Sequence, residues 1–424
     1  MVPVGLGGDV RASGRGWWPL LSTSAMAATD HSYGYALVVL GPEIARSLHI
    51  PVSAVAALIM FRGVLFFASG GFVAAGLRRR VVDPQTLTTA AGVARVAALL
   101  LTGLVTARWA LLSGVVLYGL AGVSTPYSHH ELLVATYGTT GAVTSFHRSA
   151  LRIGNVVMAG TIAPVVLIAP SHWQAVFVVL GLISAIGPAA ALSVRTPVSA
   201  PRATGRAEAD PHETFASWLI RPRLRILLLG FAVGGMFEVP MYVFAFNYLS
   251  HRWSVGAPSR AGLAAGFEFL GVALGALAVR TRVHRHRHRI AARLVGVTMV
   301  SGAAVLAASV VVRQLSGYVT LFLAAMALFG FMAPLLFAGT LTMLPPARPH
   351  FWGPGATAAF VAIAAGASAV LAWVASTYGD QAAAACFAVP AAVVGVMVIA
   401  AARTVDAAGV PAWWSRWPIP APSE

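Results

Sequence analysis

Apolar runs of about 20 residues alternate with short polar segments along nearly the whole sequence. A bilayer core of about 30 Å needs about 20 apolar residues in one helix, and a window of that length fits this chain twelve times. The pattern therefore predicts an all-α membrane protein with twelve transmembrane helices. The expected spans are residues 18–41, 53–77, 86–107, 109–130, 150–170, 173–194, 225–249, 261–280, 291–312, 317–343, 355–377 and 380–402.

One polar segment is longer than the other loops. Residues 195–224 are rich in Pro, Arg and acidic residues, which is typical of a connector rather than of a packed helix. The segment predicts two six-helix bundles, residues 1–194 and residues 225–424, the second with a cytoplasmic tail. The connector itself is expected in the cytoplasm.

Composition and charge agree with a membrane protein. Hydrophobic residues make up 58% of the chain and charged residues 10%, which is not a soluble composition. The net charge of +16 is therefore no sign of a nucleic-acid partner, and its distribution indicates topology instead. Most of the 29 arginines fall on the cytoplasmic side when the N-terminus is placed inside. Both termini are thus expected in the cytoplasm, and the chain in the cytoplasmic (inner) membrane.

The sequence indicates neither a cofactor nor a bound metal. The lone Cys386 excludes an intramolecular disulfide and gives no cysteine zinc site. No phosphate-binding loop is present, so ATP is not expected as an energy source. The histidines of RTRVHRHRHR, which begins at Arg280, alternate with arginines that oppose a cation, and this predicts contact with anionic lipid. A monomer in the lipid bilayer is expected.

The two halves resemble each other in sequence. Asp30 lies near the middle of the first apolar run, and Glu238 lies in the corresponding run of the second half, LLLGFAVGGMFEVPMYVFAFNYL. At the same offset, AALIMFRGV from Ala56 aligns without a gap with AAGFEFLGV from Ala264. A charge at the centre of a bilayer costs about 2.5–3.5 kcal/mol on insertion scales, so a duplicated acid is a functional candidate.

Short motifs resemble those of the major facilitator superfamily. LGPEIARSLHI is similar to the family's Pro-containing end of the first helix, HRSALRIGN to its Arg-x-x-Ala entry to the fifth, and WQAVF to its entry to the sixth. The loop after the second span is GGFVAAGLRRR, without the family's Asp. The resemblance covers nearly the whole chain. It implies two bundles around a central cavity, alternating access, and solute binding near the membrane midplane.

Charged residues fall near the centres of five expected spans: Asp30, Arg62, Arg95, Glu238 and Glu268. A carboxylate in a low dielectric can bind and release a proton, whereas an arginine stays charged and can pair with a carboxylate or bind an anionic solute. Helical spacing places Tyr33 near Asp30 and Tyr242 near Glu238.

The residues expected to bind solute or to carry a coupling proton are therefore Asp30, Tyr33, Arg62, Glu238, Tyr242 and Glu268. Arg95 is left out, because the resemblance implies that the third helix is peripheral. The alternative is that these charges form structural pairs between helices, as buried polar residues in membrane bundles often do.

A second polar group is expected at the cytoplasmic face. The fourth span ends at His130 and Glu131, and the fifth begins with Arg148 and Arg152. These side chains can form an inner gate or a proton relay. The alternative is that they only snorkel to the interface.

Together these features predict a secondary active transporter that moves a small organic solute, coupled to protons, with efflux as the expected direction. Two alternatives stay open. One is a polytopic membrane enzyme of the acyltransferase kind, with His130 as general base and Glu131 as its partner. The other is a non-transporting sensor with the same fold. The duplication argues against an enzyme, because one active site does not need two matching halves.

Overall fold

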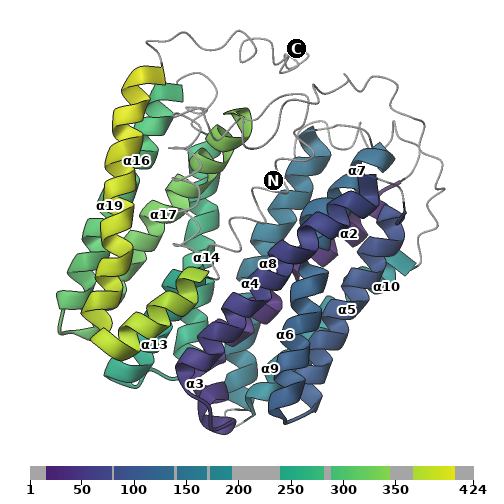
Figure 1. Ribbon diagram of the computed structural model, residues 1–424, viewed down its shortest axis with the longest axis horizontal. Helices are drawn as coiled ribbons and strands as arrows, with labels where there is room; N and C mark the ends of the chain where they lie inside the picture. The colour runs from purple at the N-terminus through teal and green to yellow at the C-terminus, as the bar shows by residue number, and fades with distance from the viewer. Residues whose placement is uncertain are drawn as a thin grey trace. The chain divides into compact units, whose positions relative to one another are not determined.

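The computed structural model describes residues 16–78, 81–137, 141–169, 172–192, 239–280, 288–343 and 366–405, and these residues are almost entirely helical, without a strand (Figure 1). Each of the twelve expected spans overlaps a helix in these ranges. Eight of the helices are long and apolar enough to cross a membrane. The all-α membrane fold is therefore confirmed, and the total of twelve spans stays a prediction. The expected connector, residues 195–224, lies outside these ranges.

The described residues form the following helices. In chain order they are α2 Trp18–Ala28, α3 Ser32–Ser47, α4 Val52–Arg78, α5 Pro84–Leu104, α6 Arg108–Gly122, the π-helix η1 Thr125–His129, α7 His130–Tyr137, α8 Gly141–Ile168, α9 Trp173–Ser184, α10 Ile186–Leu192, α13 Val239–Trp253, α14 Ala257–Arg280, α16 His288–Val311, α17 Leu315–Met343, a helix over 366–378 and α19 Asp380–Val405.

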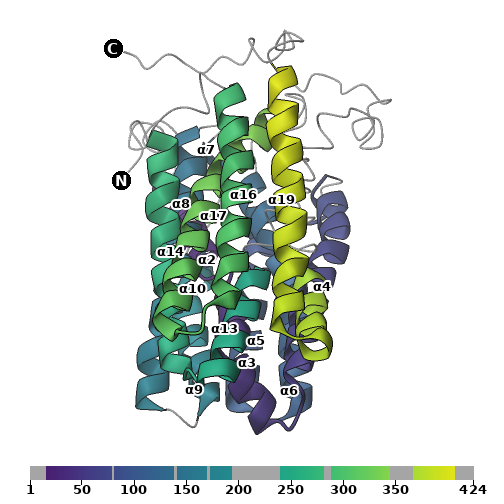
Figure 2. The same cartoon turned by 90° about the vertical axis from the view of Figure 1, so that its left-hand side faces the viewer.

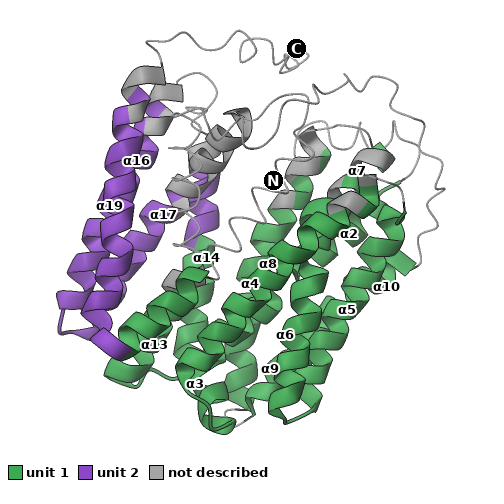
Figure 3. Cartoon of the chain, viewed as in Figure 1, with its two compact units in different colours: residues 1–202, 239–269, 354–376 green, residues 203–238, 270–353, 377–424 purple. Residues whose placement is uncertain are grey.

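The chain divides into two compact units (Figure 3). The first comprises residues 1–202, 239–269 and 354–376, and the second comprises residues 203–238, 270–353 and 377–424. The first unit thus contains α13 and the beginning of α14, which come from the expected second half of the chain, and α13 packs against α3. The expected bundle boundaries stay a prediction.

The first expected span, residues 18–41, is not one continuous helix. α2 ends at Ala28, and α3 begins at Ser32 and continues to Ser47. Thr29 and His31 have φ/ψ of −102°/4° and −99°/0°, in a sparsely populated region of backbone space where active-site residues are often found. Thr and Asp side chains compete with the backbone for hydrogen bonds, which favours a break here. Asp30 lies inside it.

The fourth expected span, residues 109–130, is also interrupted. α6 ends at Gly122, and the π-helix Thr125–His129 precedes α7. Pro126 lies within this π-helix and has no N–H to donate. Single π-turns inside α-helices are rare and are frequent at functional sites.

Aromatic side chains fill the interior of the first unit beside these two interruptions. The Tyr33 ring centroid lies 4.9 Å from that of Tyr118 and 5.2 Å from that of Phe177. All three side chains are buried. They join α3, α6 and α9 into one packed core, and such aromatic pairs add stability beyond the area they bury.

The helices of the second unit approach each other closely. α16 packs along both α19 and α17 (Figure 2). A Cβ placed on Gly296 of α16 would lie 2.6 Å from the carbonyl oxygen of Gly395 on α19. Small residues at such crossings let two backbones touch, which is how transmembrane helices gain van der Waals contact.

Gly154 of α8 permits a similar approach to the end of α2, and it provides a test of the packing around the helix break. An added Cβ would lie 2.0 Å from the carbonyl oxygen of Ala28, a backbone atom that cannot move aside. Overpacking typically lowers the free energy of unfolding by about 1–3 kcal/mol. We expect Gly154→Ala to lower it by at least this amount. This should lower the midpoint of thermal unfolding in detergent by several degrees.

The matched control is Gly160→Ala in the same helix, where the added Cβ would lie 3.9 Å from its nearest neighbour, Ala265. Equal midpoints for the two variants would contradict the packing of α8 against α2.

Candidate functional site

A buried ion pair lies at the break between α2 and α3. Nη1 of Arg95, from α5, lies 2.6 Å from Oδ1 of Asp30, and both side chains are more than 90% buried. Arg95 Nη1 also lies 3.4 Å from the carbonyl oxygen of Met26, near the end of α2. Sequence reasoning placed Arg95 at the periphery. The structure instead makes it the partner of Asp30.

The other end of the Arg95 guanidinium binds the interrupted fourth span. Nη2 donates to Ser124 Oγ at 2.8 Å and to Thr125 Oγ1 at 3.0 Å. Ser128 continues this polar strip, because its hydroxyl donates to the Ser124 carbonyl at 2.9 Å and accepts from Thr88 at 2.8 Å. Arg95 therefore joins the break in the first span to the π-helix in the fourth.

Tyr118 of α6 supports the break from its other side. Its hydroxyl lies 2.8 Å from the carbonyl oxygen of Thr29, 3.0 Å from that of Asp30 and 3.0 Å from Ser32 Oγ. A turn in the middle of a membrane span exposes backbone groups that lipid cannot satisfy. Tyr118 supplies that hydrogen bonding, and sequence reasoning did not identify it.

Tyr33 does not orient Asp30, contrary to the expectation from helical spacing. Its hydroxyl bonds Thr102 Oγ1 at 2.8 Å and donates to the Leu111 carbonyl oxygen at 3.2 Å, inside the aromatic core. The reason is the break, because α3 begins only at Ser32. Asp30 and Tyr33 therefore do not lie in one regular helix, and helical spacing does not predict that they share a face.

Arg62 of α4 faces α3 at Gly34, four residues after Asp30. A Cβ placed on Gly34 of α3 would lie 3.1 Å from both Nη1 and Nη2 of Arg62. The side chain is half-buried. Arg62 thus lies beside the break, on the side of α3 that faces α4.

A second polar cluster joins α3 to α13 and α14. Oε1 of Glu268 accepts hydrogen bonds from the hydroxyl of Tyr35 and from the hydroxyl of Tyr242, the latter at 3.0 Å. The three side chains are buried, and the two rings lie 6.1 Å apart. The structure brings together Glu268 and Tyr242, two of the expected site residues. Tyr35, rather than Tyr33, is their partner on α3.

Further along α3, a second ion pair makes contact with the same elements. Arg260 Nη2 lies 2.5 Å from Glu43 Oε2. The guanidinium also donates to the carbonyl oxygens of Val39 at 3.2 Å and Val255 at 2.8 Å. Arg260 is fully buried. Neither residue of this pair was a sequence candidate, because both lie near the ends of spans, where charges are ordinary.

The remaining candidates are only partly described. Glu238 lies outside the described residues. Glu131 is half-buried on α7 and Arg152 is exposed on α8, while His130 and Arg148 lie in these helices with side chains outside the description. The cytoplasmic gate therefore stays a prediction. The structure adds the buried His129, whose ring lies 5.3 Å from that of His147.

The fold is that of a multi-pass α-helical membrane protein. The profile of the Major Facilitator Superfamily matches residues 20–350, and the chain belongs to this family. No curated protein matches the sequence. The family assignment makes the chain a carrier of small solutes and not an enzyme, which removes the acyltransferase alternative.

Solved structures share the fold at low sequence identity. A point mutant of the nucleoside transporter NupG aligns with a TM-score of 0.68 and 13% identity, over 90% of this chain and 99% of that one. A bacterial homolog of the human lysosomal transporter Spinster, in an inward-facing and unoccupied conformation, aligns with a TM-score of 0.65 and 14% identity, over 94% and 95% of the two chains. Unmutated NupG gives 0.63 and 13%, over 90% and 98%.

The pairing of Asp30 with Arg95 can be tested by a double-mutant cycle. Asp30→Asn leaves the buried guanidinium of Arg95 without its carboxylate, and Arg95→Gln leaves the buried carboxylate of Asp30 without its guanidinium. Breaking a buried pair in this way costs about 3–5 kcal/mol. We expect the double variant to lose less stability than the sum of the two single losses, as measured by unfolding of the purified protein in detergent. Strictly additive losses would contradict a direct interaction.

Proposed function

We propose that this protein is a secondary active transporter that moves a small organic solute by alternating access, coupled to protons and in the efflux direction. The proposal places it in the cytoplasmic (inner) membrane with both termini in the cytoplasm. The observation that carries it is the break in the first span, with the paired charges of Asp30 and Arg95 inside it.

A break of this kind fits transport better than structural support. Unwound backbone at membrane depth occurs where it is buried in protein or lines a water-filled cavity, and discontinuous helices form substrate and ion sites near the midplane of transporters. Here the buried carbonyl oxygens of Thr29 and Asp30 both lie within hydrogen-bond distance of the Tyr118 hydroxyl, and that of Thr29 also accepts from Ser32. Structural support alone does not require such a break, because an unbroken helix satisfies its own backbone.

Two buried polar contacts supply what alternating access requires on one side of the membrane. Glu43 pairs with Arg260, and Glu268 accepts from Tyr35 and Tyr242, so α3 is closed against α13 and the start of α14. The arginine distribution puts this end of α3 outside the cell. We propose that these contacts form the outer gate and separate during the cycle.

The solute cannot be taken from the structural relatives, because at 13–14% identity they share the fold alone. We base proton coupling on the buried carboxylates Asp30 and Glu268 and on Glu238, which the sequence predicts within a span, since intramembrane acids commonly form proton relays. If Asp30 takes up a proton, it loses its negative charge and with it the ion pair with Arg95, which would release the break. Protonation of Glu268 would change its hydrogen bonds with the hydroxyls of Tyr35 and Tyr242.

Coupling can be measured in vesicles that contain a pH-sensitive dye, with a panel of solutes added outside. We expect the wild-type protein to link proton movement to one class of solute. Asp30→Asn or Glu238→Gln should abolish the proton signal, because neither amide can carry the proton. Glu268→Gln should be assayed in parallel.

The control for the coupling test is Asp83→Asn. Asp83 is an acid outside the membrane span that caps α5 through the Thr86 N–H at 2.8 Å, and asparagine caps equally well. Full retention of coupling in both Asp30→Asn and Glu238→Gln would rule out these two residues as the proton carriers. A wild-type protein that moves no solute would favour the sensor alternative.

The outer gate predicts a change in accessibility when Glu43 is neutralised. Glu43→Gln leaves Arg260 buried without its carboxylate, which favours separation of α3 from α14. A cysteine at position 39, whose side chain is fully buried in the wild-type protein, should then react faster with a membrane-impermeant thiol reagent from outside. The background is Cys386→Ser.

Arg313→Gln serves as the control for the gate test, because Arg313 is an exposed arginine in the loop between α16 and α17. Transport should fall in Glu43→Gln and stay unchanged in Arg313→Gln. Unchanged reactivity at position 39 in Glu43→Gln would contradict a gate at this contact.

A further inference from the structure

Arg62 carries a charge at the depth where charge is hardest to accommodate. The apolar segment of α4 runs from Val52 to Val73, so Arg62 is ten residues from one end and eleven from the other. At about 1.5 Å per residue this is about 15 Å from either end of the segment. An arginine at such a depth faces protein or a water-filled space rather than lipid, and it marks a substrate or ion pathway.

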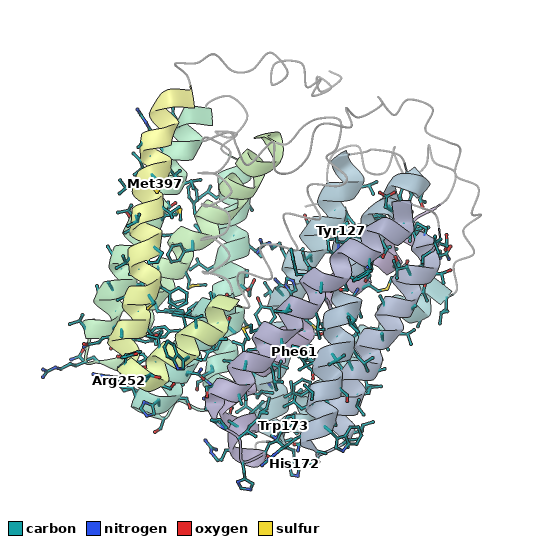
Figure 4. The ribbon with its side chains drawn as sticks, viewed as in Figure 1. Phe61, Tyr127, His172, Trp173, Arg252 and Met397 are labelled. Atoms are coloured by element: carbon teal, nitrogen blue, oxygen red, sulfur yellow. The ribbon has the colours of Figure 1, made fainter. Side chains whose placement is uncertain are left out.

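The position of Arg62 on its helix agrees with this rule. Val55, Ile59 and Phe66 are buried and lie three or four residues from Arg62 or from each other, so they share its face of α4. The exposed stripe runs through Phe61 and Val64 instead. Figure 4 marks Phe61 about half-way along the helix. Arg62, although partly exposed, therefore does not belong to the exposed stripe of α4.

Arg62 and Arg95 differ in how they are neutralised. Arg95 is 3% exposed and binds Asp30, two hydroxyl groups and a carbonyl. Arg62 has no carboxylate within 4.0 Å among the residues that the structure describes. Its buried Nε, like that of Arg95, has no hydrogen-bond partner there. Asp30 acts on it electrostatically but is already paired with Arg95. Within the described part of the chain, the positive charge of Arg62 is therefore not paired with a carboxylate of its own.

We propose that Arg62 is a solute-binding residue that recognises an anionic group, a carboxylate or a phosphate-like oxyanion, on the transported molecule. A guanidinium offers a planar fork of donors that matches such groups in two parallel hydrogen bonds. Gly34, without a side chain, leaves room for the fork beside the break. The inference rests on the proposed function and narrows its solute to organic anions.

A lipid phosphate could offer the same oxyanion chemistry. Headgroups, however, lie at the ends of the span, and the guanidinium lies near its middle. We therefore assign the anion to the solute.

Binding can be tested on the full-length protein in nanodiscs of phosphatidylcholine, which carry no net charge. The probes are benzoate and naphthoate, and the neutral isosteres benzamide and naphthamide are their controls. We expect the wild-type protein to bind an acid more tightly than its amide. In Arg62→Gln the ratio of acid affinity to amide affinity should fall by about tenfold or more, as expected for the loss of a charged hydrogen bond. Arg313→Gln, in which the replaced arginine is exposed, should keep it.

Two further variants guard against misfolding of Arg62→Gln. Arg62→Lys keeps the charge but not the fork, so it should retain part of the preference. Gly34→Ala keeps Arg62 but adds a methyl group 3.1 Å from its Nη atoms, so it should weaken acid binding and leave amide binding unchanged. Equal binding of acid and amide by the wild-type protein, or an unchanged preference in both Arg62→Gln and Gly34→Ala, would overturn the proposal.

Separate arms distinguish the other failures. If phosphatidylglycerol in the nanodiscs abolishes acid binding even at a salt concentration that screens the surface charge, the anion at Arg62 is an anionic lipid headgroup, and the solute assignment is overturned. If vesicles transport neutral solutes while acids and amides bind equally, the inference fails and the proposed transport stands. If acids bind through Arg62 but no solute moves in vesicles, the transport proposal fails and the anion site stands as that of a sensor.

Discussion

In the core of a bilayer no water is present to satisfy a charge or a broken turn of backbone, and the contact between Asp30 and Arg95 meets both needs at once. One guanidinium neutralises the carboxylate in the break, reaches a carbonyl near the end of α2 and binds two hydroxyl groups at the π-helix. Each irregularity would leave polar groups unpaired if it stood alone. Together they complete each other, so the first and fourth spans keep their breaks as a unit.

The helix that follows the break also carries the contacts of the proposed gate. α3 begins just after Asp30, and along its length Tyr35 contacts Glu268 and Glu43 contacts Arg260. The proposed gate and the ion pair at the break therefore share one helix, α3.

The sequence predicted the helical fold, the family and several members of the polar clusters, because these follow from local patterns. Hydropathy located the spans, and a charge within a span marked Asp30, Arg62 and Glu268. The partners could not be predicted in the same way. Tyr33 was expected beside Asp30 but bonds Thr102, because the break changes the direction in which later side chains of the span point, and hydropathy does not reveal a break. The contact of Tyr35 with Glu268 was not predicted at all. Arg260 meets a carboxylate more than two hundred residues away, which a single sequence does not reveal.

An anionic solute at Arg62 would make the membrane potential part of the mechanism. A unit charge that crosses the membrane gains or loses about 2.3 kcal/mol per 100 mV, and the interior of a cell is negative. Outward movement of an anion is therefore favoured by the potential itself, whereas uptake would need at least one accompanying proton to cancel the charge. The charge on the solute thus bears on direction and on coupling together. Efflux of an anion thus depends less on protons than uptake does. The number of protons moved per solute would therefore distinguish an exporter assisted by the membrane potential from an importer driven by protons.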